Sequence, residues 1–330
     1  MNFKVEVIPE MRRAVHPWRD WASYRKLRRI LAEYKPDVVH THSAKGGMLG
    51  RMAAWSLGVP SILHTVHGAP FHPYQPWIAR ELIRQAERYG AQKCHAMVSV
   101  ADAMTDLLVN AGVAPREKFT TVYSGMDVEP FLAANEHRER VRRELGFQPQ
   151  HVVIGKIARL FHLKGHEYVI DAAERVVAAC PDTHFLFVGD GILRDSLQSR
   201  IDAAGLRDHF HFTGLVAPRR IPELLGAMDI LVHASLREGL ARALPQALIA
   251  GKPAVSFDCD GAREVVISEE TGYLVPPPSV DLLAIALKKL ATDASLRDRL
   301  GQTGRDRFTD QFRHQTMTRR LREIYGRFLP

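Results

Sequence analysis

Short apolar runs alternate with stretches of helical periodicity along most of the chain. In the first part, the strand-like runs are 4–8, 37–41, 61–66, 96–100 and 119–123. In the second part, they are 151–158, 184–189, 209–214, 229–234 and 253–257. Strands that alternate with helices predict parallel sheets covered on both faces, and two series of runs predict two such sheets.

Charged, strand-poor sequence separates the two series. Residues 129–150 end in a proline-containing segment, and we expect them to form a linker. The first domain would then span 1–128 and the second 151–308. The tail, 309–330, has the pattern of one or two amphipathic helices.

The first series is shorter than a complete Rossmann-like half, which opens with a strand, a glycine-containing turn and a helix. No such unit precedes the run at 4–8. We therefore expect one or two β/α units to be missing at the front, through a misplaced start or a truncation.

Composition narrows the class of protein. The chain of 330 residues suits two domains, and its net charge of +8 suggests an anionic partner such as nucleotide phosphate or acidic lipid. The basic residues are scattered without aromatic stacking motifs, so we expect no nucleic-acid partner. Three widely spaced cysteines give neither a disulfide framework nor a zinc ribbon, which fits the cytoplasm. No run reaches the roughly 20 apolar residues of a membrane span.

A carboxylate stands in the loop between the run at 229–234 and a helix that begins near Pro245. Glu238 suits hydrogen bonds from sugar hydroxyls, and Gly239 lets a ligand approach the backbone. Gln246, in the first turn of that helix, points to the same rim. Stabilisation of the helix N-terminus by Glu238 is the alternative, and the spacing leaves both open.

Two cations follow the first run of the second series. Arg159 and Lys164 flank a turn that opens a helix at about Gly165, an arrangement that can cradle a diphosphate. Solvated surface charges are the alternative, but the position in a first β/α loop favours the cradle. The Gly-x-Gly at 188–193 is no dinucleotide fingerprint, because Arg194 replaces the third glycine.

Histidines follow two runs of the first series, and His67 is placed to hydrogen-bond a hydroxyl. Four of them suggest zinc at first sight: His40, His42, His64 and His67. We expect no metal there, because no acidic or thiol ligand accompanies them. The Asp-x-Asp of "FDCDG" (257–261) is better explained by solvated loop carboxylates.

The stretch 16–34 predicts an amphipathic helix with aromatic residues and leucines on one side and cations on another. Such a helix can lie on an anionic membrane. It can equally cover the first sheet with its aromatic side and leave its basic face in water. The two interpretations are compatible if only the basic face of the helix contacts lipid.

Eight segments resemble, in order, the family-4 retaining glycosyltransferases. They are "DVVHTHSAKGGMLGR", "HTVHG", "VYSGMD", "IARLFHLKGHEYVIDA", "FVGDG", "FTGLV", "LREGLARALPQALIAGKPAV" and "TGYLVPP". The resemblance implies an α/β fold of two facing Rossmann-like domains, the GT-B arrangement, with the first domain truncated. It also implies that the helix in 309–330 packs back on the first domain.

The resemblance also implies roles for single residues. Arg159 and Lys164 match the pair that grips the donor diphosphate, and His67 matches a cleft histidine near the transferred sugar. Glu238 matches the first acid of a Glu-x7-Glu motif that contacts donor sugar hydroxyls. Gln246 replaces the second acid, which holds the ribose. The further positions implied at the donor are Gly189, Val216, Gly239 and Leu240, and those on the acceptor side are His42, Lys45 and Gly46.

The activity implied is transfer of a sugar, with retention, from a nucleotide sugar to a glycan or lipid-linked acceptor. No metal or other cofactor is expected, and a UDP-sugar is the expected donor. The site would lie in the cytoplasm, with the basic helix 16–34 at the inner membrane face. A non-catalytic nucleotide-sugar-binding relative and a sugar-nucleotide 2-epimerase are the alternatives.

Overall fold

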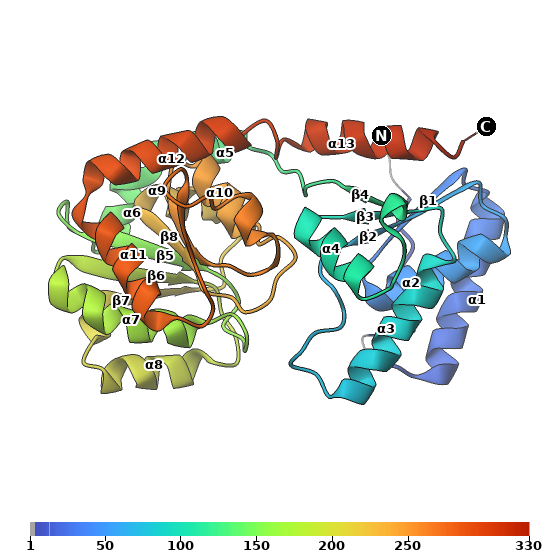
Figure 1. Ribbon diagram of the computed structural model, residues 1–330, viewed down its shortest axis with the longest axis horizontal. Helices are drawn as coiled ribbons and strands as arrows, with labels where there is room; N and C mark the ends of the chain where they lie inside the picture. The colour runs from blue at the N-terminus through green and yellow to red at the C-terminus, as the bar shows by residue number, and fades with distance from the viewer. Residues whose placement is uncertain (1–3, 13, 330) are drawn as a thin grey trace. The chain divides into compact units, whose positions relative to one another are not determined.

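The strands form two parallel sheets, one in each of two structural units, and helices pack on these sheets (Figure 1). The computed structural model describes residues 4–12 and 14–329. The N-terminal unit is drawn from residues 1–123 and 317–330, and the C-terminal unit is residues 124–316. No helix in the described part of the chain is long and apolar enough to cross a bilayer.

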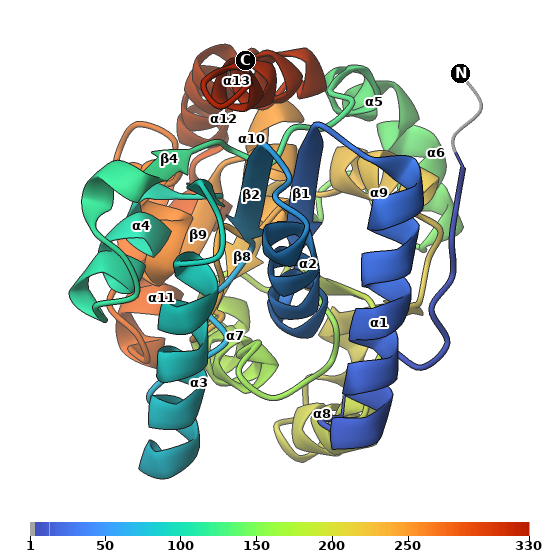
Figure 2. The same ribbon diagram turned by 90° about the vertical axis from the view of Figure 1, so that its right-hand side faces the viewer.

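The N-terminal unit has a four-stranded sheet in the order β1-β2-β3-β4, with every pair parallel. Its strands are β1 (Val38–His42), β2 (Ser61–Val66), β3 (Ala96–Ser99) and β4 (Phe119–Thr121). Its helices are α1 (Pro17–Tyr34), α2 (Ala44–Ser56), α3 (Trp77–Ala91), α4 (Asp102–Asn110) and the 3₁₀ helix η1 (Arg116–Lys118). Figure 2 shows α2 between α1 and α3. All six residues of β2 are buried, as expected of an apolar strand inside a covered parallel sheet.

The last helix, α13 (His314–Gly326), completes the N-terminal unit with residues from the far end of the chain. Ile324 is buried in one cluster with Leu63 of β2 and Val98 of β3. The sheet therefore receives part of its apolar cover from the tail.

The prediction of a strand at 4–8 is wrong. These residues have no regular secondary structure, and Val5 and Val7 are 79% and 70% exposed. Alternating apolar residues give only a local preference for a strand, and in the described sheet β1 pairs with β2 alone.

The C-terminal unit has a six-stranded parallel sheet in the order β10-β9-β8-β5-β6-β7. Its strands are β5 (Val152–Ile157), β6 (Thr183–Val188), β7 (Phe210–Gly214), β8 (Ile230–His233), β9 (Ala254–Phe257) and β10 (Gly272–Val275). Read from β7, this is the doubly wound order 3-2-1-4-5-6, whose direction reverses between β5 and β8. The sequence reasoning missed β10, a strand of only four residues.

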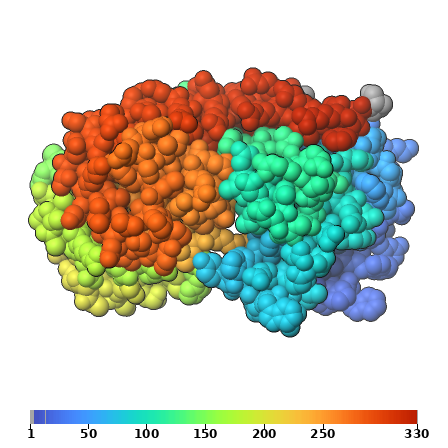
Figure 3. Space-filling view, in the orientation of Figure 1, coloured from blue at the N-terminus to red at the C-terminus, as the bar shows by residue number. Residues whose placement is uncertain are grey.

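Helices cover both faces of this second sheet. They are α5 (Glu129–Leu132), α6 (Arg138–Glu144), α7 (His166–Ala179), α8 (Arg194–Ala203), α9 (Ile221–Ala227), α10 (Ala243–Ile249), α11 (Val280–Thr292) and α12 (Ala294–Phe308). Short 3₁₀ helices are η2 (Ala134–His137), η3 (Arg207–His209), η4 (Pro218–Arg220) and η5 (Asp260–Glu264). Gly304 of α12 packs on Leu248 of α10, and in Figure 3 the red atoms of α12 lie along the upper edge of the unit.

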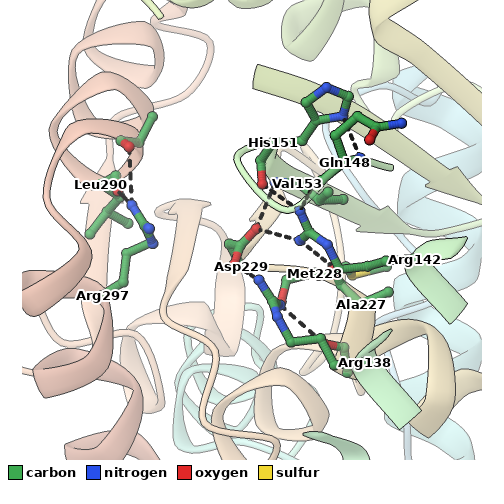
Figure 4. A network of polar contacts seen from close by, with 12 residues as sticks. Arg138, Arg142, Gln148, His151, Val153, Ala227, Met228, Asp229, Leu290 and Arg297 are labelled. Atoms are coloured by element: carbon green, nitrogen blue, oxygen red, sulfur yellow. Dashed lines mark hydrogen bonds and ion pairs between the residues drawn. The ribbon is translucent and has the colours of Figure 1, made fainter. Parts of the chain in front are cut away.

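Residues 129–150, interpreted above as a linker, fold as α5, η2 and α6 within the C-terminal unit. Figure 4 shows the ion pairs and hydrogen bonds that join α6 to the amino end of the sheet. Arg138 and Arg142 bind the two carboxylate oxygens of Asp229 at 2.6 and 3.2 Å. The amide of Val153, in β5, donates to the same carboxylate at 2.8 Å. Two arginines of the segment are therefore part of the sheet's own polar network.

Candidate functional site

The loops at the carboxyl ends of β5 and β8 meet at the point where the strand order reverses. Doubly wound sheets bind ligands in the crevice at this point. The amide of Leu236 donates to the carbonyl of Leu163 at 2.9 Å, which joins the two loops. Gly165 makes the approach feasible, because a Cβ there would lie 1.9 Å from the carbonyl oxygen of Ala234. Its φ of +66° also favours glycine.

This junction brings Lys164 and Glu238 into direct contact. The Lys164 ammonium donates a hydrogen bond to Oε1 of Glu238 and forms an ion pair with it. The two side chains are 20% and 24% exposed, so the pair is accessible but partly shielded from water. The loop that carries Glu238 is fixed from behind, because its amide donates to Oδ2 of Asp260 at 2.8 Å. The amide of Gly261 donates to the carbonyl of Gly239 at 2.9 Å.

Arg159 lies in the same loop as Lys164 and is exposed. Its guanidinium carbon lies 5.0 Å from the ring centroid of Phe161, and it has no ion-pair partner among the residues that the structure describes. The loop after β6 packs against this backbone at Gly189, where a Cβ would lie 2.2 Å from the carbonyl oxygen of Ala158. The expected phosphate-binding cation is therefore open to solvent at the carboxyl edge of β5.

The other donor-side residues named by the sequence are more dispersed. Leu240 is partly buried in the loop after β8, Gln246 is partly buried in α10, and Val216 follows β7. All belong to segments that follow strands at their carboxyl ends. Over residues 4–12 and 14–329, no hydrogen bond or ion pair recorded in the structure joins these three side chains to Lys164 or Glu238.

Beneath the Lys164–Glu238 pair lies a buried group of ionisable side chains that the sequence reasoning missed. Lys156 of β5, His166 of α7 and His233 of β8 are each at most 4% exposed. Nε2 of His233 lies 3.9 Å from Oε1 of Glu238. Burial, and then the charge of Lys164, lowers the pKa of Lys156 to about 7. Burial also lowers the pKa of His166 to about 2. A lysine inside the apolar run "VVIGKIA" was the available signal.

In the N-terminal unit, His42 ends β1 and His67 follows β2, so both lie at the carboxyl edge of the sheet. Their rings are stacked, and Nδ1 of His42 lies 3.1 Å from Nε2 of His67. Behind them, His40 bonds Tyr325 of α13 at 2.7 Å and Thr65 at 2.6 Å. The neighbouring cavity, of about 70 Å³, is lined by residues that include His64, His67, Pro70 and Glu87.

Lys45 and Gly46 lie in the first turn of α2, which follows β1 at this edge. Lys45 is engaged within its own unit, because its ammonium donates to Oδ1 of Asp20 at 2.8 Å and to the carbonyl of Ala14. The hydrogen bond from Lys45 holds the pKa of Asp20 below its usual value. In the described parts of the chain, no three His, Cys, Asp or Glu side chains are grouped as metal ligands.

Comparison with known proteins assigns the family. The family model of glycosyl transferases group 1 matches residues 137–307, more than half of the chain. The model of glycosyltransferase family 4 matches residues 3–130. The chain belongs to the group 1 glycosyltransferases. The resemblance of its eight segments to family-4 glycosyltransferases is thereby confirmed.

Individual group 1 relatives are distant in sequence. A UDP-Gal:alpha-D-GlcNAc-diphosphoundecaprenol alpha-1,3-galactosyltransferase of Escherichia coli is 26% identical over 96% of this chain and 82% of its own length. A 2-deoxystreptamine N-acetyl-D-glucosaminyltransferase of Streptomyces fradiae is 29% identical over 83% of this chain and 69% of its own. The crystal structure of Anabaena HepE with UDP is 21% identical, with a TM-score of 0.82 over 93% of this chain and 82% of HepE. This likeness confirms the predicted α/β fold of two parallel-sheet units.

Proposed function

We propose that this glycosyltransferase takes a sugar from a nucleotide sugar, with a UDP-sugar as donor, and that the donor binds at the β5–β8 junction. The observation that carries the proposal is the Lys164–Glu238 pair at the reversal of strand order, with Arg159 exposed in the same loop as Lys164. The name of the Escherichia coli relative specifies UDP-Gal and a diphosphoundecaprenol-linked sugar. HepE was crystallised with UDP-glucose. These names support a UDP-sugar donor and a glycan or lipid-linked acceptor here.

The chemistry of the site fits departure of a nucleoside diphosphate. When the bond from the anomeric carbon to the phosphate oxygen breaks, negative charge develops on the diphosphate. Arg159, Lys164 and the amides at the start of α7 can stabilise that charge, which is the role a metal ion has in other transferases. Glu238, released from Lys164, can accept hydrogen bonds from sugar hydroxyls. Leu240 and the amide of Gly239 would line the same pocket, with Gly189 and Val216 on the nucleotide side and Gln246 at the ribose.

We further propose that the transfer retains the anomeric configuration and needs no metal. The acceptor oxygen would bond to the anomeric carbon on the face that the diphosphate leaves, and its proton would pass to the departing phosphate oxygen. In the N-terminal unit, His67 and His42 would hydrogen-bond the sugar or the acceptor, with Lys45 and Gly46 at the acceptor. The His42–His67 contact fixes the orientation of both rings.

The direct test is donor binding and sugar transfer by the purified protein. UDP-, GDP- and ADP-sugars are compared by calorimetry, and transfer is followed with lipid-linked and free glycan acceptors. Arg159→Ala and Lys164→Ala should each lower the rate by about 100-fold, as removal of one preorganised donor does elsewhere. Arg175→Ala is the matched control, since Arg175 is an exposed cation of α7 paired with Asp281. Equal effects of all three changes would overturn the assignment of the site.

The finer parts of the proposal have separate readouts. The anomeric configuration of the product is read by NMR, and inversion would overturn the retaining mechanism. Loss of activity in EDTA that returns with a divalent cation would overturn metal independence. An epimer formed from the donor alone would point to an epimerase. Donor binding without any product would point to a binding protein.

We also propose that α1 holds the protein against an anionic membrane. The apolar side of this helix is divided: Tyr24, Leu27 and Leu31 are partly buried, whereas Trp18 and Trp21 are 78% and 55% exposed. Arg25 stacks on Trp21, with its guanidinium carbon 4.8 Å from the ring centroid. Exposed tryptophans beside cations suit the interface of an acidic bilayer. Trp18→Ala/Trp21→Ala should then weaken sedimentation with phosphatidylglycerol vesicles, and unchanged sedimentation would refute this role.

A further inference from the structure

Several buried polar atoms under the Lys164–Glu238 pair have no hydrogen-bond partner among the residues that the structure describes. They are the ammonium of Lys156, both ring nitrogens of His166, Nε2 of His233 and the hydroxyl of Ser235. All four residues are buried. Buried polar atoms in folded proteins almost always have a partner, and an unpaired one destabilises the fold. A cluster of unpaired polar atoms next to the proposed donor-binding loops therefore suggests a functional role.

The positions of these side chains place them at the base of the site. Lys156 is the second-last residue of β5 and lies opposite Phe187 of β6. The ring of His166 packs edge-on against Phe187, with centroids 5.1 Å apart. His233 is the last residue of β8 and approaches Glu238 to 3.9 Å. The group therefore fills the space between β5, β8 and the start of α7, under the loops that carry Lys164 and Glu238.

Charged and titratable groups reach Lys156 from each of these elements. Burial is the main cause of its low pKa, and the positive charge of Lys164 lowers it further, while the carboxylates of Glu238 and Glu167 oppose both. The other neighbours that interact with it electrostatically are His166 and His233. Burial lowers the pKa of both histidines, so they remain neutral at physiological pH. Lys156 is thus the group of this cluster whose charge responds to what binds above it.

We propose that Lys156 is a positioning residue for the donor: it takes up a proton when a diphosphate binds Lys164, and its charge then holds the Glu238 carboxylate in place beneath the sugar. The inference rests on the proposed function. A diphosphate neutralises Lys164 and so removes the repulsion that disfavours a second ammonium nearby. At the same time Glu238 loses Lys164 as its partner, and without a nearby positive charge it would face the phosphates alone. Lys156 supplies that charge from the protein side.

Proton uptake on binding can be measured by calorimetry with UDP as the probe. Titrations at about pH 8 in buffers of different ionisation enthalpy give the number of protons taken up. At that pH a group with a pKa of about 7 is roughly 90% deprotonated. The terminal phosphate of UDP, with a pKa of about 6, is already ionised. We expect uptake approaching one proton for the wild type and close to none for Lys156→Met.

A second buried lysine provides the matched control. Burial also lowers the pKa of Lys252, to about 8, but Lys252 precedes β9 and interacts with Arg138 and Asp229 at the amino end of the sheet. Lys252→Met should therefore take up the same number of protons as the wild type.

The outcomes separate the two proposals. If UDP does not bind the wild type, the proposed function fails and the inference fails with it. If UDP binds without proton uptake, the inference alone is overturned, and the wild-type measurement decides this even where a variant does not fold. Uptake that persists in Lys156→Met, or in a Lys156→Gln variant made alongside, also overturns it.

Discussion

Replacing Lys156 by methionine should stabilise the C-terminal unit at neutral pH. The wild-type ammonium is fully buried and has no hydrogen-bond partner among the described residues. Methionine is unbranched and close to lysine in size, so the change removes the ionisable group and largely keeps the packing. The prediction needs no ligand, and it tests directly whether the burial of this lysine is as unfavourable as the structure indicates.

The magnitude follows from the pKa of Lys156, which burial lowers from 10.5 to about 7. A group whose folded pKa lies below its unfolded pKa makes the unfolded state bind more protons between the two values. The stability of the wild type should therefore rise as the pH increases from about 7 to 10.5. Below about pH 7 the destabilisation caused by the buried lysine is present in full. The full difference corresponds to an upper limit of roughly 5 kcal/mol. Lys156→Met should lack this pH dependence.

The assay is urea unfolding at about pH 7 and pH 10, followed by circular dichroism and by tryptophan fluorescence. All four tryptophans lie in the N-terminal unit, so their fluorescence serves as an internal control for that unit; they are Trp18, Trp21, Trp55 and Trp77. The variant should be more stable than the wild type at pH 7, and the gain should shrink by at least about 2 kcal/mol at pH 10. A gain of the same size at both pH values, or a loss of stability at pH 7, would refute the reasoning.

Three further changes test the framework around the sites. Asp229→Asn leaves two arginines without their countercharge and should destabilise the C-terminal unit by about 3 kcal/mol in urea. Burial alone would raise the pKa of Asp229, but Arg138 and the hydrogen bonds hold it below 3.8. The wild type should therefore lose the stabilisation from the ionised Asp229 as the pH falls below 3.8, and the variant should show no such loss. Gly226→Ala places a Cβ about 2.0 Å from the carbonyl oxygen of Ala134 and should lower the urea midpoint seen by circular dichroism. Tyr325→Phe removes the hydrogen bond to His40 and should destabilise the N-terminal unit by about 1 kcal/mol in the fluorescence transition.

Much of the fold could be predicted because its central strands are buried on both faces. Such strands must be almost continuously apolar, and runs such as 61–66 and 184–189 stand out against the charged helices between them. The alternation at 4–8 gave a wrong prediction because a strand also needs a partner strand, which sequence alone does not reveal. The segment 129–150 misled because its charges suggest solvent, whereas Arg138 and Arg142 are tied to Asp229.

The candidate site was only partly accessible to sequence reasoning. Strand ends and glycines predict that Lys164 and Glu238 lie in loops at one edge of a sheet, but their direct contact depends on the close approach of two loops at Gly165. The cluster around Lys156 depends on three elements that come together only in the folded chain. His166 and His233 are separated by 67 positions, so no local pattern could indicate that they share one buried space.

The Lys164–Glu238 pair also bears on which ligands the site favours. A nucleoside diphosphate can bind Lys164, but Glu238 then loses its direct hydrogen-bond donor next to new negative charge, even where Lys156 is protonated nearby. A nucleotide sugar brings hydroxyl donors for that carboxylate together with the diphosphate for the lysine, so both halves of the broken pair find new partners. Because the pair is only partly exposed, an unsatisfied carboxylate there is more costly than one in open water. If the donor binds at this pair as proposed, the site should discriminate in favour of the complete donor over the spent nucleotide, and the return of Lys164 to Glu238 would then assist release of the nucleotide after transfer.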